Sequence, residues 1–411
     1  MGKKLTTLCL IFVAAGVLKI LSAEDYVNPY RYNSEYEMDM LQNYFHPEDE
    51  FLWLGAENGF RTTGGSLNIR HIYNFQEAKF RFELVKNRFY LRYIFLNNQY
   101  LNYEVKSNLL ELEYFFWRNI FLKLTLQPDR HKGDIDAGFG LGVGLDEKNK
   151  VWAEYRLVDF DKNYAFRNRT VYEGYEEFYD TLPKKWIFGL NSQSDKLKIG
   201  ADFWVQTPSE LRHSDFVRND NYKQEYEEIA FNGNILRSLD TLGLGVRGKY
   251  YGNKYKIYRP DGYTREDRAQ KVIEQVITPY ALYRINERNE LFSGVSFINL
   301  YGSRMPYLET SEKIYYKGDE ILPFINWYYS ITPKSRFETG YMHDSIYRKE
   351  LIQPDTFKRG MRRENRLRLA YEYRFTEKIY MKFMMGWELD KEDFGKSAFF
   401  DGGYFQFQGV F

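Results

Sequence analysis

The sequence has a single cysteine, Cys9, and it lies within the first twenty residues. The segment around it predicts an export signal, because Lys3 and Lys4 precede a mostly apolar stretch and Ala23 provides a small residue for cleavage. We therefore expect residues 1–23 to be removed. The remaining chain would have no disulfide, no thiol nucleophile and no thiolate metal site.

A long apolar run is also missing beyond residue 23, where no stretch of about 18 apolar residues predicts a transmembrane helix. Net charge is nearly absent: without three signal lysines, 55 of the 58 basic residues remain against 57 acidic ones, a formal charge of −2. This balance gives no support for a nucleic-acid partner.

Metal-binding and catalytic motifs are equally scarce. The histidines are scattered, at His46, His71, His131, His213 and His343, and none has the spacing of a metal-ligand pair. No nucleotide-binding or calcium-binding fingerprint is present. Asp344 stands between His343 and Ser345, but adjacent residues of a strand point to opposite faces, so these three do not form a triad. We expect no cofactor, no metal and no enzymatic activity.

Aromatic residues, in contrast, are abundant: they make up 19% of the chain, with 37 tyrosines, although the mean hydropathy is only −0.60. A soluble core does not need so many tyrosines. A β-barrel in a membrane does, because amphipathic rings form girdles at both water–lipid boundaries.

The end of the chain shows the pattern most clearly. Phe405, Phe407 and Phe411 fall on one face of a period-2 strand, and Gln406 and Gln408 fall on the other. These residues resemble the C-terminal signature of bacterial outer-membrane β-barrel proteins. The resemblance implies that the three phenylalanines form an assembly signal, and that the partners include the barrel-assembly machinery, outer-membrane lipid and lipopolysaccharide.

Comparable alternation recurs along the chain and predicts an all-β fold, a single antiparallel transmembrane barrel over residues 59–411. Eighteen strands are expected, or sixteen if the first segment or the pair at 272–300 is misassigned. The predicted strands cover residues 66–73, 78–85, 88–95, 110–116, 120–126, 135–145, 151–158, 185–190, 197–205, 227–236, 242–250, 272–285, 291–300, 321–331, 337–347, 366–375, 379–389 and 398–411.

Two classes of connection separate these strands. Tight turns alternate with longer segments, at residues 97–108, 159–184, 206–224, 251–271, 301–318 and 349–363. Outer-membrane barrels have this asymmetry, with short periplasmic turns and long extracellular loops. An even strand count places both ends of the barrel on the short-turn side.

Residues 24–58 stand apart as an acidic N-terminal segment, with a capping-box pattern at residues 34–37 and apolar residues up to Tyr44, before Pro47 ends the helical pattern. We expect a short helix or plug at the mouth of the barrel, with a partly ordered extension as the alternative.

The face opposite the apolar one would line the lumen, where basic residues outnumber acidic ones. The predicted pore-lining residues are Lys79, Arg81, Arg88, Arg92, Glu113, Arg156, Arg247, Lys249, Arg336, Glu338, Arg366, Arg368, Glu372, Arg374 and Lys382. The excess of positive charge would favour anions. Two alternatives remain for these charges: acids such as Glu113 and Glu338 pair with neighbouring bases and stiffen the wall, or the acidic segment docks against the basic cluster at Arg366–Lys382.

The sequence therefore predicts an outer-membrane porin or exporter for small hydrophilic solutes, anionic ones such as sugar acids. Strand number and an arginine-rich lumen are similar to those of alginate-export-type barrels. The alternatives are a barrel sheath around a periplasmic or extracellular partner and, less favoured, an outer-membrane hydrolase.

Overall fold

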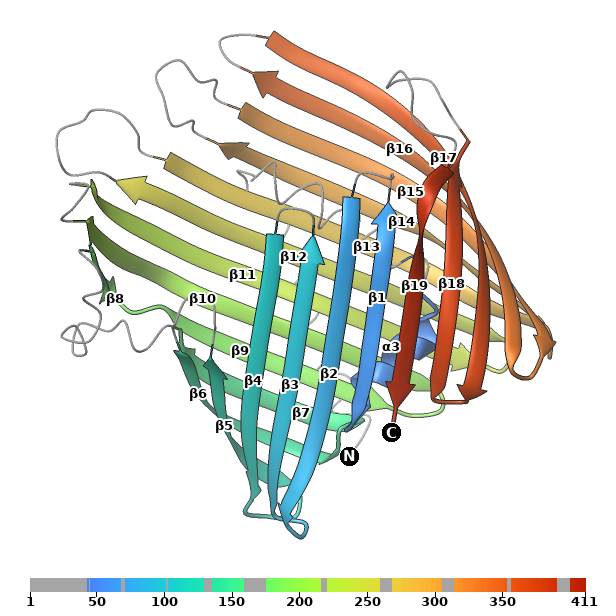
Figure 1. Ribbon diagram of the computed structural model, residues 1–411, viewed down its shortest axis with the longest axis horizontal. Coiled ribbons are helices and arrows are strands. Elements are labelled where there is room, and N and C mark those ends of the chain that lie inside the picture. Colours follow the sequence, from blue (N-terminus) through green and yellow to red (C-terminus); the bar gives the residue numbers. More distant parts are fainter. Residues whose placement is uncertain are drawn as a thin grey trace.

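The protein folds as one closed antiparallel β-barrel, seen in the computed structural model (Figure 1). The structure describes residues 43, 45–67, 71–100, 103–128, 135–158, 175–215, 220–258, 268–304, 314–352, 356–389 and 400–411. The capping box predicted at residues 34–37 lies outside these ranges. Except where the barrel closes and around one interrupted strand, strand neighbours in the barrel are neighbours in sequence, as expected of a meander.

The described elements are one helix and nineteen strands. They are α3 (Pro47–Leu54), β1 (Gly59–Leu67), β2 (His71–Val85), β3 (Phe89–Tyr100), β4 (Tyr103–Phe115), β5 (Ile120–Pro128), β6 (Ile135–Asp146), β7 (Asn149–Leu157), β8 (Tyr175–Thr181), β9 (Lys184–Gln193), β10 (Leu197–Asp215), β11 (Asp220–Leu239), β12 (Leu242–Tyr258), β13 (Arg268–Asn286), β14 (Asn289–Arg304), β15 (Ile314–Thr332), β16 (Ser335–Ile352), β17 (Thr356–Thr376), β18 (Ile379–Glu388) and β19 (Phe400–Val410).

The barrel closes where the sequence predicts, between its last strand and its first. β19 pairs with β1 from Gly59 opposite Val410 to Leu67 opposite Gly402, and the Phe411 amide donates to the Asn58 carbonyl at 3.0 Å. This pairing removes the open edge that a flat sheet would expose.

The barrel wall counts as eighteen strands, although nineteen are assigned, because β8 and β9 together occupy the position of a single strand. β9 pairs with the first half of β10, and β8 continues the same line along its second half. Pro183, which has no amide to donate, separates the two parts, and the register of β10 slips opposite it, between Gln206 and Ser209. The predicted count of eighteen is confirmed.

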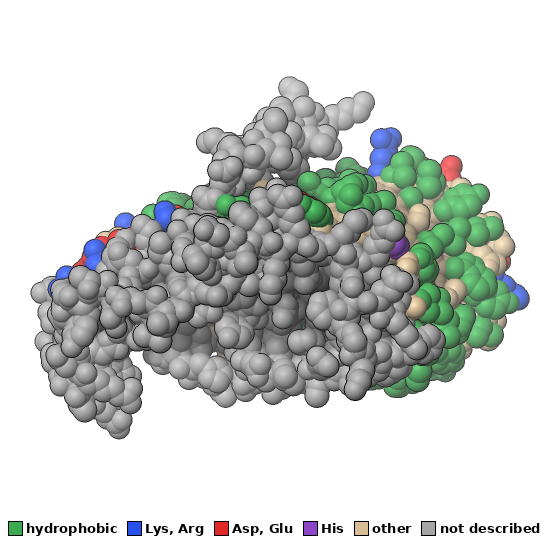
Figure 2. Space-filling model, turned by 90° about the horizontal axis from the view of Figure 1, so that it is seen from above, with side chains coloured by type: hydrophobic (Ala, Val, Ile, Leu, Met, Phe, Trp, Pro, Cys, Tyr) green, Lys and Arg blue, Asp and Glu red, His purple; other side chains and the backbone are tan. Residues whose placement is uncertain are grey.

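Apolar side chains cover the outside of the barrel, as the alternation predicts. Leu369, Tyr371, Phe383 and Met385 are all exposed, and Figure 2 shows apolar side chains over much of the outer wall on the right of the view. Such a surface on a closed sheet is stable only in hydrocarbon. The protein is an integral outer-membrane β-barrel, and Phe405 lies on its lipid-facing side.

Aromatic residues gather on this outer surface near the tight turns. Tyr114, Phe116 and Trp117 border one such turn, and Tyr371 and Phe375 approach another; all five side chains are exposed. They form part of the girdle that the tyrosine content predicts.

The tight turns lie at one end of the barrel, and the end of β19 lies there too (Figure 1). Asn87 and Asp240 occupy two of these turns with positive φ, which Asn and Asp tolerate better than most residues. At the other end the strands continue beyond the predicted boundaries. β10 and β11, for example, leave only residues 216–219 between them, instead of the predicted 206–224. The polar ends of these strands lack apolar alternation, which is why the sequence pattern did not reveal them.

The predicted first strand at residues 66–73 is wrong, because it straddles the connection between β1 and β2. The true first strand begins at Gly59. Thr62, Thr63, Gly64 and Gly65 interrupt its alternation, so the pattern gave no signal there.

The inward glycines of β6 make room for side chains of the neighbouring strands. A Cβ on Gly138 would lie 2.5 Å from a Glu154 oxygen, and one on Gly142 would lie 2.1 Å from Cζ of Phe121, which is fully buried.

We expect Gly142→Ala to destabilise the barrel by about 1–3 kcal/mol, because the Phe121 ring has to move out of a packed position. Gly248→Ala is the matched control, since its new methyl group would meet only Phe231, at 3.6 Å. Urea unfolding in lipid vesicles measures both. Equal stabilities of the two variants would contradict this packing.

Candidate functional site

A short segment of chain lies inside the barrel near the tight-turn end, behind β1 and β19 (Figure 1). It consists of residues 43 and 45–58 and contains α3; we call it the inner segment. Pro47 occupies the first turn of α3, and the His46 ring accepts a hydrogen bond from the Glu48 amide at 3.3 Å. Pro47 thus begins a helix, whereas the sequence pattern placed the end of one there, because proline suits the first helical turn as well as the residue after a helix.

The inner segment is bound through its backbone by side chains from well-separated strands. The carbonyl of Phe45 accepts from Arg247 of β12 at 3.1 Å, and that of Asp49 accepts from Gln408 of β19 at 3.2 Å. The carbonyls of Phe51 and Leu54 accept from Gln193 and Asn191 of β9, at 2.9 and 3.2 Å. The Leu54 carbonyl lies in the last turn of α3, where helix carbonyls lack a partner within the helix, whereas the Phe51 carbonyl also accepts from the Gly55 amide at 3.0 Å.

Its acidic side chains meet basic residues at four places around the wall. Those pairs are Glu48 with Lys198 of β10, Asp49 with Arg374 of β17 at 3.1 Å and Arg336 of β16 at 3.9 Å, Glu50 with Arg247 at 3.1 Å, and Glu57 with Arg81 of β2 at 2.5 Å. Through Asp49 and Arg374, the inner segment therefore contacts the basic cluster that the sequence predicted at Arg366–Lys382.

Apolar contacts also hold it. Phe51 belongs to a buried cluster with Leu236, Tyr280 and Phe292 of the inner wall. Trp53 is buried between Arg61 and Lys79, whose charged groups lie 4.7 Å from its ring centroid. Burial of two such side chains contributes about 3–6 kcal/mol, so the inner segment is a docked element of the fold.

The two neighbouring carboxylates of α3 differ in acidity. Burial raises the pKa of Glu50 above its usual value, and nearby Arg247 compensates only in part. Burial acts in the same direction on Asp49, but the charges of Arg374 and Arg336 outweigh it and hold its pKa below the usual value. Asp49 is therefore the carboxylate that stays charged over the wider pH range.

A cavity of about 410 Å³ lies between the inner segment and the wall. Arg61, Asp202, Arg247 and Lys249 line it together with amide and hydroxyl groups such as that of Asn232. Its volume lies within the usual range for small-molecule sites.

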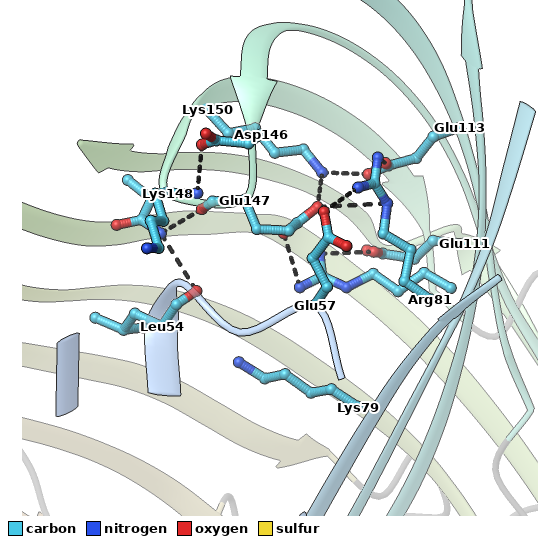
Figure 3. Close-up of polar contacts among 12 residues, drawn as sticks. Leu54, Glu57, Lys79, Arg81, Glu111, Glu113, Asp146, Glu147, Lys148 and Lys150 are labelled. Carbon is cyan, nitrogen blue, oxygen red and sulfur yellow. Dashed lines mark hydrogen bonds and ion pairs between the residues drawn. The ribbon is translucent and has the colours of Figure 1, made fainter. Parts of the chain in front are cut away.

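On one side of the lumen, charges from β2 to β7 form a compact network (Figure 3). Lys150 pairs with Glu113 and, at 3.1 Å, with Glu147 in the β6–β7 turn. Arg92 lies 3.0 Å from the same Glu147, and Arg81 lies 3.8 Å from Glu113. The favourable charges of Arg92 and Lys150 overcome burial and lower the pKa of Glu147.

A second network lies on β16, β17 and β18. Glu338 is fully buried and lies 2.9 Å from Lys382, 3.2 Å from Arg336 and 3.8 Å from Arg368. Glu372 contacts Arg336 at 2.9 Å and Arg374 at 2.7 Å.

Fourteen of the fifteen predicted pore-lining residues are buried or half-buried on the inner face. This set is Lys79, Arg81, Arg92, Glu113, Arg156, Arg247, Lys249, Arg336, Glu338, Arg366, Arg368, Glu372, Arg374 and Lys382. Arg88 differs, because it lies exposed in the tight turn before β3. The two networks bring nine of the fourteen together in ion pairs, which is the wall-stiffening alternative for Glu113, Glu338 and Glu372.

Sequence reasoning missed several acids that balance the lumen. Glu147 lies in a turn, and Glu77 of β2 pairs with Arg61 at 2.6 Å in a region where the alternation is weak. Glu48, Asp49 and Glu50 belong to α3, which begins at Pro47, where the sequence pattern placed the end of a helix. The only signal for them was an acidic triplet directly after a proline, which is typical of a first helical turn.

The residues that suggested a hydrolase do not converge. His343 and Ser345 share the outward face of β16, with 3.0 Å between the ring nitrogen and the hydroxyl, while Asp344 is buried on the inner face. Within the described ranges, no group of three or more His, Cys, Asp or Glu residues is placed to hold a metal ion.

We expect Glu338→Ala to lower the free energy of unfolding by about 3–5 kcal/mol, because it leaves Lys382 and Arg368 buried with one counter-charge fewer. Glu227→Ala is the matched control: its pair with Lys254 is partly exposed, so its loss costs about 1 kcal/mol or less. Urea titration of tryptophan fluorescence compares them. If both variants lose the same small amount, the buried network does not stabilise the wall.

The structure and sequence were compared with known proteins. No family model and no curated protein matches the chain. Among solved structures, OccK2 (OpdF) of Pseudomonas aeruginosa is 11% identical, with a TM-score of 0.39, covering 86% of this chain and 96% of that one.

OccK10 (OpdN) of the same organism is 10% identical, with a TM-score of 0.38 and coverages of 86% and 97%. Outer-membrane expressed OmpT of Vibrio cholerae is 9% identical, with a TM-score of 0.34 and coverages of 86% and 96%. At these identities and scores nothing about solute or mechanism is carried over. In the part of the chain that the structure describes, no helix is long and apolar enough to cross a membrane.

Proposed function

We propose that the protein is an outer-membrane channel for small hydrophilic solutes, with a preference for anions such as sugar acids, and that the inner segment closes it near the tight-turn end. The observation that carries this proposal is the inner segment itself, whose contacts reach β2, β9, β10, β12, β16, β17 and β19. A barrel of eighteen strands is wide enough for an aqueous channel, so a separate element is needed to close it.

The anion preference depends on the docked acids. The inner segment contributes Glu48, Asp49, Glu50 and Glu57 and contains no Lys or Arg. When it leaves the lumen, four negative charges leave with it, while Lys198, Arg247, Arg374 and Arg81 stay on the wall. An open lumen would then be more positive than the closed one and would lower the energy of anions within it.

The wall networks limit this preference to the region of the inner segment. Glu113 and Glu154 already offset Lys150 and Lys123, so that side of the lumen carries little excess charge in either state. The architecture remains similar to alginate-export-type barrels in strand number and in arginines along the lumen, which supports an anionic solute.

The reversal potential of a barrel lacking residues 24–54, in planar bilayers under a potassium chloride gradient, tests the proposal. We expect a chloride-selective reversal potential. The same barrel with Arg247→Gln and Arg374→Gln should lose part of that selectivity, because the deletion vacates three basic sites and these substitutions neutralise two of them. Cation selectivity would refute the anion preference, and the absence of any conductance would favour a barrel that encloses a partner protein.

A further inference from the structure

The inner segment presents its carboxylates to the wall as a bound anionic ligand would. Three of them, Glu48, Asp49 and Glu50, are consecutive, yet they contact Lys198, Arg374 and Arg247 on three different strands. Because consecutive residues of a helix point in different directions, the three side chains reach different parts of the lumen wall. The cavity beside them has Asp49, Glu50 and Arg247 in its lining, so a solute entering it reaches the Glu50–Arg247 pair.

Two of these carboxylates, Glu48 and Glu50, are only partly shielded, which distinguishes them from the acids of the wall networks. The side chain of Glu48 is 39% exposed and that of Glu50 is 23% exposed, whereas Glu113 and Glu338 are fully buried. A solute carboxylate can therefore approach Lys198, whose side chain is 22% exposed, without breaking the wall. Arg247 is covered while Glu50 is docked on it and becomes available when Glu50 is displaced. Arg247 and Arg374 are guanidinium groups, which bind carboxylates through paired hydrogen bonds.

We propose that Lys198, Arg247 and Arg374, together with Arg81, which pairs with Glu57, are a binding site for a soluble polycarboxylate. It competes with the carboxylates of the inner segment and thereby opens the channel. The inference rests on the proposed function and adds its regulation. A polycarboxylate favours the undocked state because only there are all four sites available to it. A neutral solute of the same size binds the docked and undocked states equally well, so it does not shift the equilibrium between them, however well it fits the cavity.

The competition has to overcome more than charge, since Phe51 and Trp53 are buried as well. A single carboxylate replaces only one pair and leaves the apolar contacts intact. Several carboxylates on one molecule act together, because binding of the first raises the effective concentration of the rest. The site therefore selects for polyvalent anions over monovalent ones.

The test measures undocking directly, in the full-length chain. Ala56 is buried at the end of the inner segment, so Ala56→Cys, in a chain with Cys9→Ser, reports undocking through its rate of maleimide labelling. The probes are trigalacturonate, with galacturonate and maltotriose at equal concentration and ionic strength. We expect trigalacturonate to raise the labelling rate about tenfold or more, and the other two to change it by less than about twofold.

Arg247→Gln should reduce this acceleration, while Lys254→Gln, which removes a base that faces Glu227 and not the inner segment, should leave it unchanged. Should Ala56→Cys fail to fold, the open probability of the unaltered chain in bilayers provides the same comparison. Equal effects of trigalacturonate and maltotriose would overturn the competition. If the barrel lacking residues 24–54 conducts but trigalacturonate has no effect on the intact chain, the competition is also overturned. If that barrel does not conduct, the channel proposal itself fails.

Discussion

Deleting residues 24–54 should convert a barrel with very low ion conductance into a conducting channel. The deletion removes α3 and with it Phe51, Trp53 and three of the four docked carboxylates, while β1 and its pairing with β19 remain. A docked state favoured by a few kcal/mol leaves about 0.1–10% of channels open, so the mean conductance should rise about 10- to 1,000-fold. Single-channel recording in planar bilayers measures this change.

A shorter deletion, of residues 24–42, provides the control, because it keeps the whole inner segment. We expect its conductance to match that of the intact chain. If the longer deletion folds, as judged by its resistance to protease in vesicles, and still conducts no more than the control, another part of the barrel closes the lumen.

Placing a charge on the outer wall should be the most damaging single substitution on the surface. Leu124 of β5 is half exposed and lies between Leu112 and Phe139 on neighbouring strands, so Leu124→Arg would place a cation against lipid. Near the middle of a bilayer such a change costs about 2–4 kcal/mol. Reversible unfolding in phospholipid vesicles gives the loss.

Trp117→Arg is the matched control, because Trp117 lies in the β4–β5 turn at the boundary and is 70% exposed. Its cost should be about 1 kcal/mol or less. Equal costs for the two variants would mean that Leu124 does not face hydrocarbon.

Much of the barrel could be predicted because lipid on one side and charge on the other impose a strict period of two. β2, β17 and β18 follow it: their apolar residues Phe82, Leu369 and Met385 are exposed, while Lys79, Arg368 and Lys382, predicted to face inward, are buried. The rule fails where both faces are apolar. In β13 to β15 the inward residues Tyr280, Phe292 and Phe324 form a buried cluster with Phe51 of the inner segment, so the alternation is weak there.

The lumen was harder to predict than the wall. Which base meets which acid depends on strand tilt and register, and Arg92 of β3 reaches Glu147 in the distant β6–β7 turn. A count of lumenal charges from clear strands therefore overestimated the positive excess. The position of the inner segment also depends on contacts far apart in sequence, such as Asp49 with Arg374, which no local pattern reveals.

The assembly signal predicted at Phe405, Phe407 and Phe411 stays a prediction. Phe411 is largely exposed at the end of β19, and Phe405 faces outward beside Phe383. Both side chains are therefore accessible from the outside of the closed barrel.

The central claim is that the inner segment lies docked inside the barrel in its native membrane. Carbodiimide treatment of the unaltered protein in outer-membrane fragments, followed by mass spectrometry, tests it directly, because it joins a lysine to a carboxylate only when the two are in contact. We predict a link between Glu48 and Lys198, alongside one between Glu227 and Lys254 as an internal standard. Recovery of the standard without the Glu48–Lys198 link would contradict the account.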